Sequence, residues 1–439
     1  MRKLSEIARR KIFWLLDTLK GSAIKKHSIE IASLLEGDNT NAQKTKENKL
    51  KKLLLHATTT TPFYKKYNHY KSLNDFPVIS KTLVRENFDQ FISDAFTKEQ
   101  QIATVTSGST GTPFKVLQHA QKKIRNSADT MYFAKRAGYK IGDRLMYMKI
   151  WSANNKKQKM LGIMQNMMPV DVITFNDKEI AALIKKMEND SSNFSFLGYS
   201  SALENICRWL DKSNHGKVKA KLSSAISMSE TLNDYTKQTI EKYFGVPVYS
   251  RYSNLENGIL AQQVIGSGNN YLINTASYLL EIFKMNEDVS AADGELGRII
   301  VTDLYNYAMP MIRYDSGDTG ILSNYNDGKG NIYLETVEGR RLDLLYATDG
   351  SLLSSYIVYK NMWQYTEILQ YQLIQYGLKS YLFKINLSGV FTKEKKLISE
   401  FKQYLGDDAD FRVEYVDEIP LLASGKRKKI VNTYHSKIQ

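Results

Sequence analysis

The sequence predicts a two-domain α/β protein, with a large multi-layer α/β domain on the N-terminal side and a small α+β domain on the C-terminal side. The 439 residues are more than one hydrophobic core usually serves. Between residues 140 and 230, short apolar runs such as DRLMYMKIW and FSFLGYS alternate with helical patterns such as KEIAALIKKMEN. This alternation is typical of a sheet that is covered by helices.

Local signals mark several element ends. We expect KKLLLHATTTTPFYKKY to form a helix that ends before Pro62, and FPVISKTLVREN (76–87) to run from a loop into a helix capped by Ser80. A further helix is expected around 119–137. In LNDYTKQTIEKYFGVPVYSRYS, the pattern predicts a helix with Gly245 as its C-terminal cap, followed by a strand.

The C-terminal part is expected to be rich in strands. Strands dominate from 271 to 334, and the sequence GRRLD predicts a domain boundary. Beyond it, YQLIQYGLKSYLFKINL has the pattern of strands and KEKKLISEFKQYL that of one charged helix. We therefore predict a large domain over residues 1–338, a hinge over 339–343 and a small lid domain over 344–439.

The composition bounds the compartment and the kind of partner. A single cysteine, Cys207, excludes a disulfide framework and fits a reducing cytoplasm. It lies in an amphipathic helical pattern, which favours a core position over a nucleophile. The net charge of +15 favours anionic partners such as nucleotides, nucleic acid or a membrane face. No run of eighteen apolar residues occurs, so we expect no transmembrane helix.

The N-terminal segment MRKLSEIARRKIFWLLDTLKGSAIKK leaves two alternatives open. Its short apolar run is flanked by basic residues and lacks a small-residue cleavage site, which is unlike a secretory signal. It is either a basic helix packed on the domain or a surface anchor for anionic lipid at the inner face of the membrane. The pattern favours packing.

A Ser/Thr- and Gly-rich stretch, TVTSGSTGTPFKV at 104–116, is the most informative segment of the chain. Glycines allow successive backbone N–H groups to turn toward one anion, and hydroxyls add donors, so the loop suits a polyphosphate. It is not a Walker A loop, because G-x-x-x-x-G-K-[ST] does not occur. The alternative is a polar surface turn between strands.

Three further segments carry candidate binding residues. In YSRYSNLENGILAQQ, Tyr252 is a candidate for contact with a purine and Glu256 for a Mg²⁺ that bridges phosphates; the alternative is an exposed Tyr and Glu after a strand. In MPMIRYDSGDTGIL, Asp318 is a candidate acceptor for both ribose hydroxyls, and the alternative is a hairpin turn. In EIPLLASGKRKKIV, Lys426 lies on a short loop, and the alternative is a solvated basic tail.

Taken in this order, the four segments resemble the adenylate-forming superfamily, and more closely its branch of phenylacetate–CoA ligases and CapK-like proteins of bacterial polysaccharide loci. TSGSTGTPFK resembles the phosphate loop, SRYSNLENG the Tyr–Glu motif, and GELGRIIVTDLYNYAMPMIRYDSGDTG the ribose motif. VEGRRLD resembles the hinge and PLLASGK the lid-lysine segment. The resemblance covers most of the chain.

The resemblance implies a cytoplasmic ligase that adenylates a carboxylic acid with ATP and Mg²⁺, and then transfers the acyl group to coenzyme A or another nucleophile, as a step in surface-polysaccharide biosynthesis. It implies catalytic roles for Thr106, Glu256 and Lys426, with Glu256 on the metal and Asp343 as the hinge pivot. The implied ATP-binding residues are Thr106, Ser107, Gly108, Ser109, Thr110, Gly111, Thr112, Tyr252, Asp318 and Arg340.

Two features depart from that pattern, and one alternative function remains. Phe114 separates Lys115 from the loop proline, where relatives commonly place lysine directly, and Leu342 replaces an acidic hinge residue. Trp151, Tyr199 and Ser229–Glu230 lie near the motifs without an assigned role. The alternative is a basic nucleic-acid- or membrane-binding protein on an inactive ligase scaffold. No recognised nucleic-acid-binding motif occurs, so we expect no nucleic acid as a partner.

Overall fold

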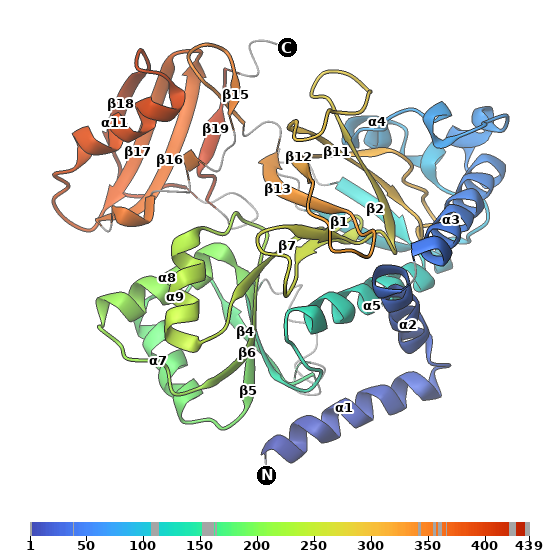
Figure 1. Ribbon diagram of the computed structural model, residues 1–439, viewed down its shortest axis with the longest axis horizontal. Helices are drawn as coiled ribbons and strands as arrows, with labels where there is room; N and C mark the ends of the chain where they lie inside the picture. Colours follow the sequence, from blue (N-terminus) through green and yellow to red (C-terminus); the bar gives the residue numbers. More distant parts are fainter. Residues whose placement is uncertain are drawn as a thin grey trace. The chain divides into compact units, whose positions relative to one another are not determined.

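The computed structural model divides into two compact units (Figure 1). The first is built from residues within 1–337 and the second mainly from 338–439. The residues that the structure describes are 2–37, 39–106, 114–151, 162, 165–340, 344–353, 357–358, 362–365, 367–420 and 427–434. The predicted hinge lies largely outside this part of the chain, so the domain boundaries stay a prediction.

A mixed sheet forms the centre of the first unit. In its described part the strand order is β10 (Tyr278–Phe283), β11 (Gly297–Asp303), β12 (Tyr314–Ser323), β13 (Tyr333–Arg340), β9 (Tyr271–Ile273), β8 (Gly258–Gln263), β7 (Val248–Asn254), β6 (Lys221–Met228), β5 (Asn193–Tyr199), β3 (Arg144–Lys149) and β4 (Met167–Asp171). From β4 to β7 neighbouring strands run parallel, and from β7 to β9 they alternate in direction.

Helices cover both faces of the parallel half of the sheet. On one face, Phe196 of β5 packs edge-on against Phe244 of α9 (Asp234–Phe244), at 5.4 Å between ring centroids. On the other, Ile226 of β6 packs with Ala134 of α5 (Ala120–Arg136). The other helices of this region are α7 (Asp177–Glu188) and α8 (Ser200–Lys212) (Figure 1). The predicted α/β class is therefore confirmed, and Cys207 is buried on α8, as expected of a core residue.

The N-terminal part is helical. It comprises α1 (Arg2–Leu19), α2 (Ala23–Glu36), α3 (Asn39–Thr60) and α4 (Lys81–Glu86), with 3₁₀ turns at Pro62–Tyr67, Leu73–Asp75, Phe88–Phe91 and Lys98–Gln100. The predicted stop before Pro62 is confirmed, and the Ser80 hydroxyl caps α4 by accepting a hydrogen bond from Leu83 N at 3.1 Å. Among the described helices, none combines the length and apolar character needed to cross a bilayer.

The second unit has its own core. Its main sheet has the order β18 (Asp410–Tyr415), β17 (Ser380–Leu387), β16 (Ile368–Gly377) and β19 (Ile430–Asn432), beside a small pair, β14 (Leu345–Tyr346) and β15 (Leu352–Leu353), and a 3₁₀ turn at Met362–Gln364. The helix α11 (Glu394–Leu405) packs on the main sheet, where Phe401 meets Phe383 at 4.8 Å. The predicted small domain of strands with one charged helix is thus confirmed in its element content.

Buried charges fix α5 to the rest of the first unit. The guanidinium of Arg125 is fully buried and uses all three nitrogens, donating to Ser277 Oγ at 2.7 Å, to Glu30 Oε2 at 2.7 Å and to Ala276 O at 2.8 Å. Its Nε also lies 3.5 Å from the buried carboxylate of Asp129. A buried guanidinium is tolerated only where such partners compensate its desolvation.

We expect Arg125→Met to lower the free energy of unfolding by about 3–5 kcal/mol, because it leaves buried acceptors and a carboxylate without their cation. The matched control on the same helix is Arg136→Met, whose partner Glu36 is 40% exposed, with an expected cost of about 1 kcal/mol or less. Urea denaturation of the full chain measures both. Similar, small losses for the two variants would contradict this account of α5.

Candidate functional site

Two of the predicted nucleotide-binding residues meet across the first unit's sheet. The phenol of Tyr252, on β7, donates a hydrogen bond to Asp318 Oδ2 on β12 at 2.8 Å, and its oxygen lies 3.3 Å from Ser316 Oγ. The two residues are 66 positions apart in the chain. The structure therefore brings together the Tyr–Glu motif and the ribose motif, as the sequence predicts.

A bulge in β12 aims Asp318 at Tyr252. Between the pairs Arg298↔Thr319 and Ile300↔Asp315, β12 carries three residues opposite the single residue Ile299. Gly317 has a φ of +81°, which a residue with a side chain rarely adopts. The Ser316 hydroxyl bonds to Ile299 O at 2.9 Å and accepts from Asp318 N at 3.2 Å, so the bulge is held in place. The alternative of a hairpin turn at this segment is wrong.

The carboxylate of Glu256 is buried and has two donors. It is 2% exposed, and Oε1 accepts a hydrogen bond from the Tyr314 phenol at 2.9 Å. The ammonium of Lys81 lies 3.3 Å from the same oxygen. The backbone carbonyl of Glu256 accepts from Gln118 Nε2 at 2.8 Å. The alternative of an exposed Tyr and Glu is also wrong, since Tyr252 is only 8% exposed.

The stem of the Ser/Thr-rich loop packs beside this carboxylate. The strands β1 (Ile102–Thr106) and β2 (Phe114–Gln118) form an antiparallel pair that the loop connects, with Thr106 opposite Phe114. Phe114 is buried and its ring is parallel to that of Tyr314, 6.0 Å away. One side of Tyr314 thus touches the loop's stem, and its hydroxyl holds Glu256.

Burial sets the protonation of the two tyrosines. Burial, with the negative charge of Asp318 adding to it, raises the pKa of Tyr252 well above its usual value. Burial and the adjacent Glu256 carboxylate do the same to the pKa of Tyr314. Both phenols therefore stay protonated at neutral pH and act as hydrogen-bond donors to the two carboxylates.

Several predicted site residues lie outside the described part of the chain. For Thr106 and Arg340 the backbone is described, at the ends of β1 and β13, but not the side chain. The others are Ser107, Gly108, Ser109, Thr110, Gly111, Thr112, Asp343 and Lys426. Their roles stay predictions.

The sequence interpretation missed two residues that hold the site together. Lys81 follows the Ser80 cap, and Tyr314 lies in the ribose motif, but neither was assigned a role. Ile79 pairs with β12, donating its N–H to Arg313 O at 3.0 Å and accepting from Asp315 N at 2.8 Å, and this pairing places Lys81 beside Glu256. The one sequence signal for the role of Tyr314 in holding Glu256 is its position in the ribose motif, between Arg313 and Asp315.

The described residues offer one carboxylate, that of Glu256, as a candidate ligand for a metal ion. In the described residues, no group of three or more His, Cys, Asp or Glu side chains is arranged to hold a metal ion. Glu256 supplies one buried carboxylate. Among its described contacts, both donors, the Tyr314 phenol and the Lys81 ammonium, lie at Oε1. Mg²⁺ at phosphate-binding sites is commonly held by one or two carboxylates plus phosphate oxygens and water, so this residue fits such an ion.

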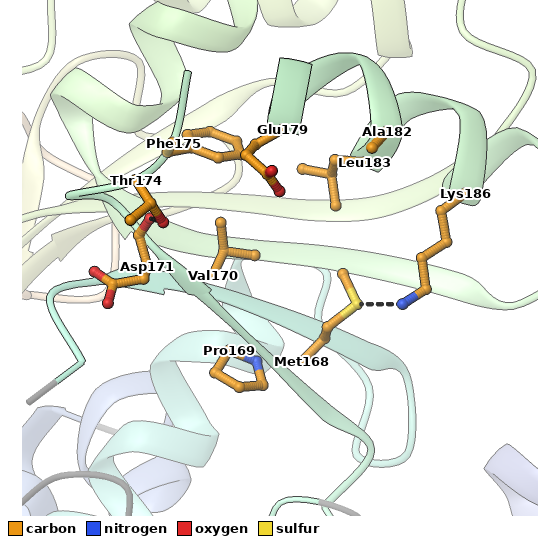
Figure 2. A pocket seen from close by; sticks show the side chains of 10 residues that line it. All are labelled: Met168, Pro169, Val170, Asp171, Thr174, Phe175, Glu179, Ala182, Leu183 and Lys186. Carbon is orange, nitrogen blue, oxygen red and sulfur yellow. Dashed lines mark hydrogen bonds between the residues drawn. The ribbon is translucent and has the colours of Figure 1, made fainter. Parts of the chain in front are cut away.

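A separate hollow of about 360 Å³ opens at the edge strand β4 (Figure 2). It lies between β4 and α7, and the Lys186 ammonium donates to Met168 Sδ at 3.2 Å inside it. None of the sequence-predicted site residues lines it. It carries no cluster of catalytic groups, and we assign it no function.

The fold is that of adenylate-forming ligases. A crystal structure of 2-hydroxyisobutyryl-CoA ligase in the postadenylation state, in complex with R3-HIB-AMP, superposes with a TM-score of 0.71 and 16% identity, covering 92% of each chain. An ATP-bound RpMatB-BxBclM chimera gives a TM-score of 0.52 and 13% identity, covering 76% of this chain and 67% of that one. The large mixed α/β unit and the small α/β unit are those of this class.

Sequence comparison shows similarity to CapK proteins in particular. Residues 345–433 match the CapK C-terminal domain. Protein CapK of Staphylococcus aureus is 24% identical over 374 residues, which are 82% of this chain and 80% of that protein. The chain is therefore similar in sequence to CapK and has the fold of adenylate-forming ligases, and the predicted resemblance is confirmed.

We expect Tyr314→Phe to lower the free energy of unfolding by about 1.5–3 kcal/mol, because the buried Glu256 carboxylate loses a charged hydrogen bond that water does not replace. The control is Tyr243→Phe, whose phenol donates to Asp211 at 2.8 Å. Asp211 is 36% exposed, so water compensates and the loss is smaller. Urea denaturation compares them, and a larger loss for the control would count against the held carboxylate.

Proposed function

We propose that this protein adenylates a carboxylic acid with ATP and then transfers the acyl group to coenzyme A or another nucleophile. The observation that carries the proposal is the hydrogen bond between Tyr252 and Asp318. Beside it, the buried carboxylate of Glu256 is held by Tyr314, whose ring stacks on Phe114 at the stem of the Ser/Thr-rich loop. Structures with this fold are in complex with ATP or with R3-HIB-AMP, which supports the same substrate class here.

The first step joins two anions. A carboxylate oxygen of the acid forms a bond to the α-phosphorus of ATP, the bond from that phosphorus to the oxygen of the leaving group breaks, and pyrophosphate departs. In the second step the nucleophile attacks the acyl carbon, and AMP leaves with the electron pair of the broken C–O bond. Catalysis of such a reaction consists mainly of alignment and of neutralising charge.

The described residues suit the nucleotide in this scheme. Asp318 offers two acceptor oxygens to the cis-hydroxyls of ribose, and Tyr252 keeps that carboxylate oriented while presenting its ring to the adenine. Glu256 would hold Mg²⁺, which supplies positive charge to the phosphates when bound. Until then, the 41% exposed Lys81 ammonium, 3.3 Å from Oε1, provides a positive charge beside the buried Glu256 carboxylate.

The remaining roles rest on the motifs. The hydroxyls and glycines from Thr106 to Thr112 would cradle the β- and γ-phosphates, and Arg340 would contact the nucleotide. Lys426 would offset charge on the carboxylate and α-phosphate during adenylation. Rotation of the small domain about Asp343 would then withdraw Lys426 and admit the acyl acceptor.

ATP–pyrophosphate exchange over a panel of carboxylic acids tests the proposal. We expect at least one acid to support exchange, and Lys426→Ala, Asp318→Asn and Glu256→Gln each to lower the rate about 10²–10³-fold, the scale of a lost electrostatic catalyst. Lys428→Ala, which removes a lysine two positions from Lys426, is the matched control and should exchange like the wild type. Undiminished exchange in Lys426→Ala would remove that residue from the scheme.

The exposed face of α1 adds a membrane contact to the proposed function. Ile12, Leu15, Leu16 and Leu19 follow the spacing of one helix face and are 50%, 59%, 39% and 75% exposed. The polar face of the helix is turned inward instead. Glu6 accepts hydrogen bonds from the backbone N and the side-chain amide of Asn193, both at 2.8 Å.

Two further polar contacts fix this orientation. Arg10 donates from Nε to Ile141 O at 2.9 Å, and Asp17 accepts from the backbone N–H groups of Ile24 and Lys25, both at 3.0 Å, at the start of α2. The sequence favoured a helix packed on the domain, and in the structure the helix contacts the domain through its polar face.

The charge of this surface suits an anionic bilayer. In the described residues of α1, the acidic side chains Glu6 and Asp17 are buried, whereas Lys11 is exposed beside the apolar face, and Lys20, Lys25 and Lys26 follow it. Apolar side chains flanked by lysines are the composition of helices that lie in the interface of anionic membranes. We therefore propose that α1 lies on the inner face of the membrane.

We expect the full chain to cosediment with vesicles of equal parts phosphatidylglycerol and phosphatidylcholine, and the double variant Leu15→Glu/Leu19→Glu to partition at least about tenfold less, because two exposed apolar side chains are lost from the interface. Val390→Glu, at an 84% exposed apolar site of the second unit, is the control and should bind like the wild type. Equal partition of all three, or a change in oligomeric state instead of vesicle binding, contradicts the membrane assignment.

A further inference from the structure

A buried guanidinium in the parallel half of the sheet has no anionic partner in the described chain. Arg251, on β7, donates from Nε to Gln262 Oε1 at 2.7 Å, but its Nη2 is buried and makes no hydrogen bond. Burial lowers the pKa of Arg251 to about 10, and among the described residues the Tyr147 phenol, and no carboxylate, opposes that shift. Arg125, which satisfies all three nitrogens, shows what a structural buried arginine requires in this fold.

A second cation without a carboxylate lies on the same face. Lys149 ends β3, and its ammonium lies over the rings of Tyr147 and Trp151, at 4.8 and 4.5 Å from their centroids. Burial lowers its pKa. Among the described residues no carboxylate forms an ion pair with it, and the chain from Lys149 to Val170 contains no Asp or Glu.

Strand register puts the two cations on one face at the same edge of the sheet, three strands apart, which is about 14 Å between their backbones. Tyr199 of β5 is paired with Met228 of β6, and Met228 with Arg251 of β7. Lys149 follows Met148, which is paired with Gly198, so Lys149 falls in the same row. Side chains in one row of a parallel sheet point to the same face, and this row lies at the carboxyl ends of the strands, where ligands of open α/β sheets bind.

Tyr147 connects the two positions. It lies two residues before Lys149 on the same face of β3. Burial raises the pKa of its phenol, and the positive charge of Arg251 opposes that rise. The nearby carboxylate of Glu230 is engaged elsewhere, accepting from Ser201 N at 2.8 Å at the start of α8. Among the described residues, the face therefore holds two cations and aromatic rings, and the nearby Glu230 carboxylate is already bonded.

We propose that Arg251 and Lys149 bind a second anionic group on the acid substrate, so that the substrate class is a dicarboxylate or another acid that carries a second negative charge. This inference rests on the proposed function, since it names the acid of that reaction. One carboxylate of the substrate would react at the α-phosphate. The other anionic group would neutralise the buried guanidinium, whose desolvation the unliganded protein leaves uncompensated. The rings of Tyr147 and Trp151 would enclose the carbon chain between them.

The test compares acids of equal chain length in ATP–pyrophosphate exchange, butanedioate against butanoate and pentanedioate against pentanoate. We expect the wild type to prefer the diacid at least about thirtyfold, and Arg251→Met and Lys149→Met to reduce that preference to a few-fold while leaving the rate with the monoacid within a few-fold. Lys186→Met, which removes the lysine of the hollow at β4, is the control and should keep the preference.

A second measurement needs no turnover. Thermal unfolding without ATP should show that butanedioate or inorganic phosphate raises the Tm of the wild type and of Lys186→Met, but not of Arg251→Met. Without ligand, Arg251→Met should be at least as stable as the wild type, because it removes an uncompensated buried charge. A large loss of stability in Arg251→Met would overturn the inference, since it would mean that the guanidinium is already compensated.

The two proposals fail in different ways. Exchange that is supported by monoacids and not by diacids, with no effect of either anion on the Tm, refutes the second-anion site and leaves the adenylating function standing. A rise in Tm that depends on Arg251, with no exchange for any acid, supports the anion site and refutes the adenylating function. If neither exchange nor a rise in Tm is observed, both proposals are refuted.

Discussion

One side chain, Tyr314, links the parts of the candidate site. Its ring stacks on Phe114 at the stem of the Ser/Thr-rich loop, and its phenol holds the buried carboxylate of Glu256. Two positions further along β12 begins the bulge that turns Asp318 toward Tyr252. The phosphate end and the ribose end of the proposed nucleotide site therefore depend on one strand, and on the backbone pairing of Ile79 that fixes this strand against the N-terminal segment.

The elements that local chemistry determines were predictable from the sequence. The Ser80 cap and the stop before Pro62 each depend on residues a few positions apart, so one sequence suffices to find them. Tyr252, Glu256 and Asp318 are candidates because of the order of their motifs; the structure brings Tyr252 and Asp318 into contact, and the binding roles of all three stay predictions. Lys81 and Arg251 could not be found in this way. Lys81 is distinguished by its tertiary contact with Glu256, and Arg251 by a buried Nη2 that makes no hydrogen bond in the described chain.

The orientation of α1 shows a different limit of sequence reasoning. An amphipathic pattern states that a helix has two unlike faces, but not which of them meets the protein. Here Glu6, Arg10 and Asp17 make long-range or capping hydrogen bonds that only these polar groups can make. Once they fix the helix, Leu15 and Leu19 stay 59% and 75% exposed in the described part of the chain. An exposed apolar face held in place by specific polar bonds is expected of a binding surface, because a helix free to rotate would bury it.

The two buried arginines of the first unit show how function can be separated from stability. Arg125 satisfies every nitrogen and lies within reach of two carboxylates, so its charge is compensated in the folded chain alone. Arg251 keeps an unused donor in the interior, and a fold selected for stability alone would replace it with an apolar residue. In the proposed site, the desolvation of that guanidinium is offset when the second anionic group of the substrate binds. An acid with a second anionic group then gains binding free energy, because the guanidinium it meets is already dehydrated. An acid without that group gains none, and the site would discriminate between the two in this way.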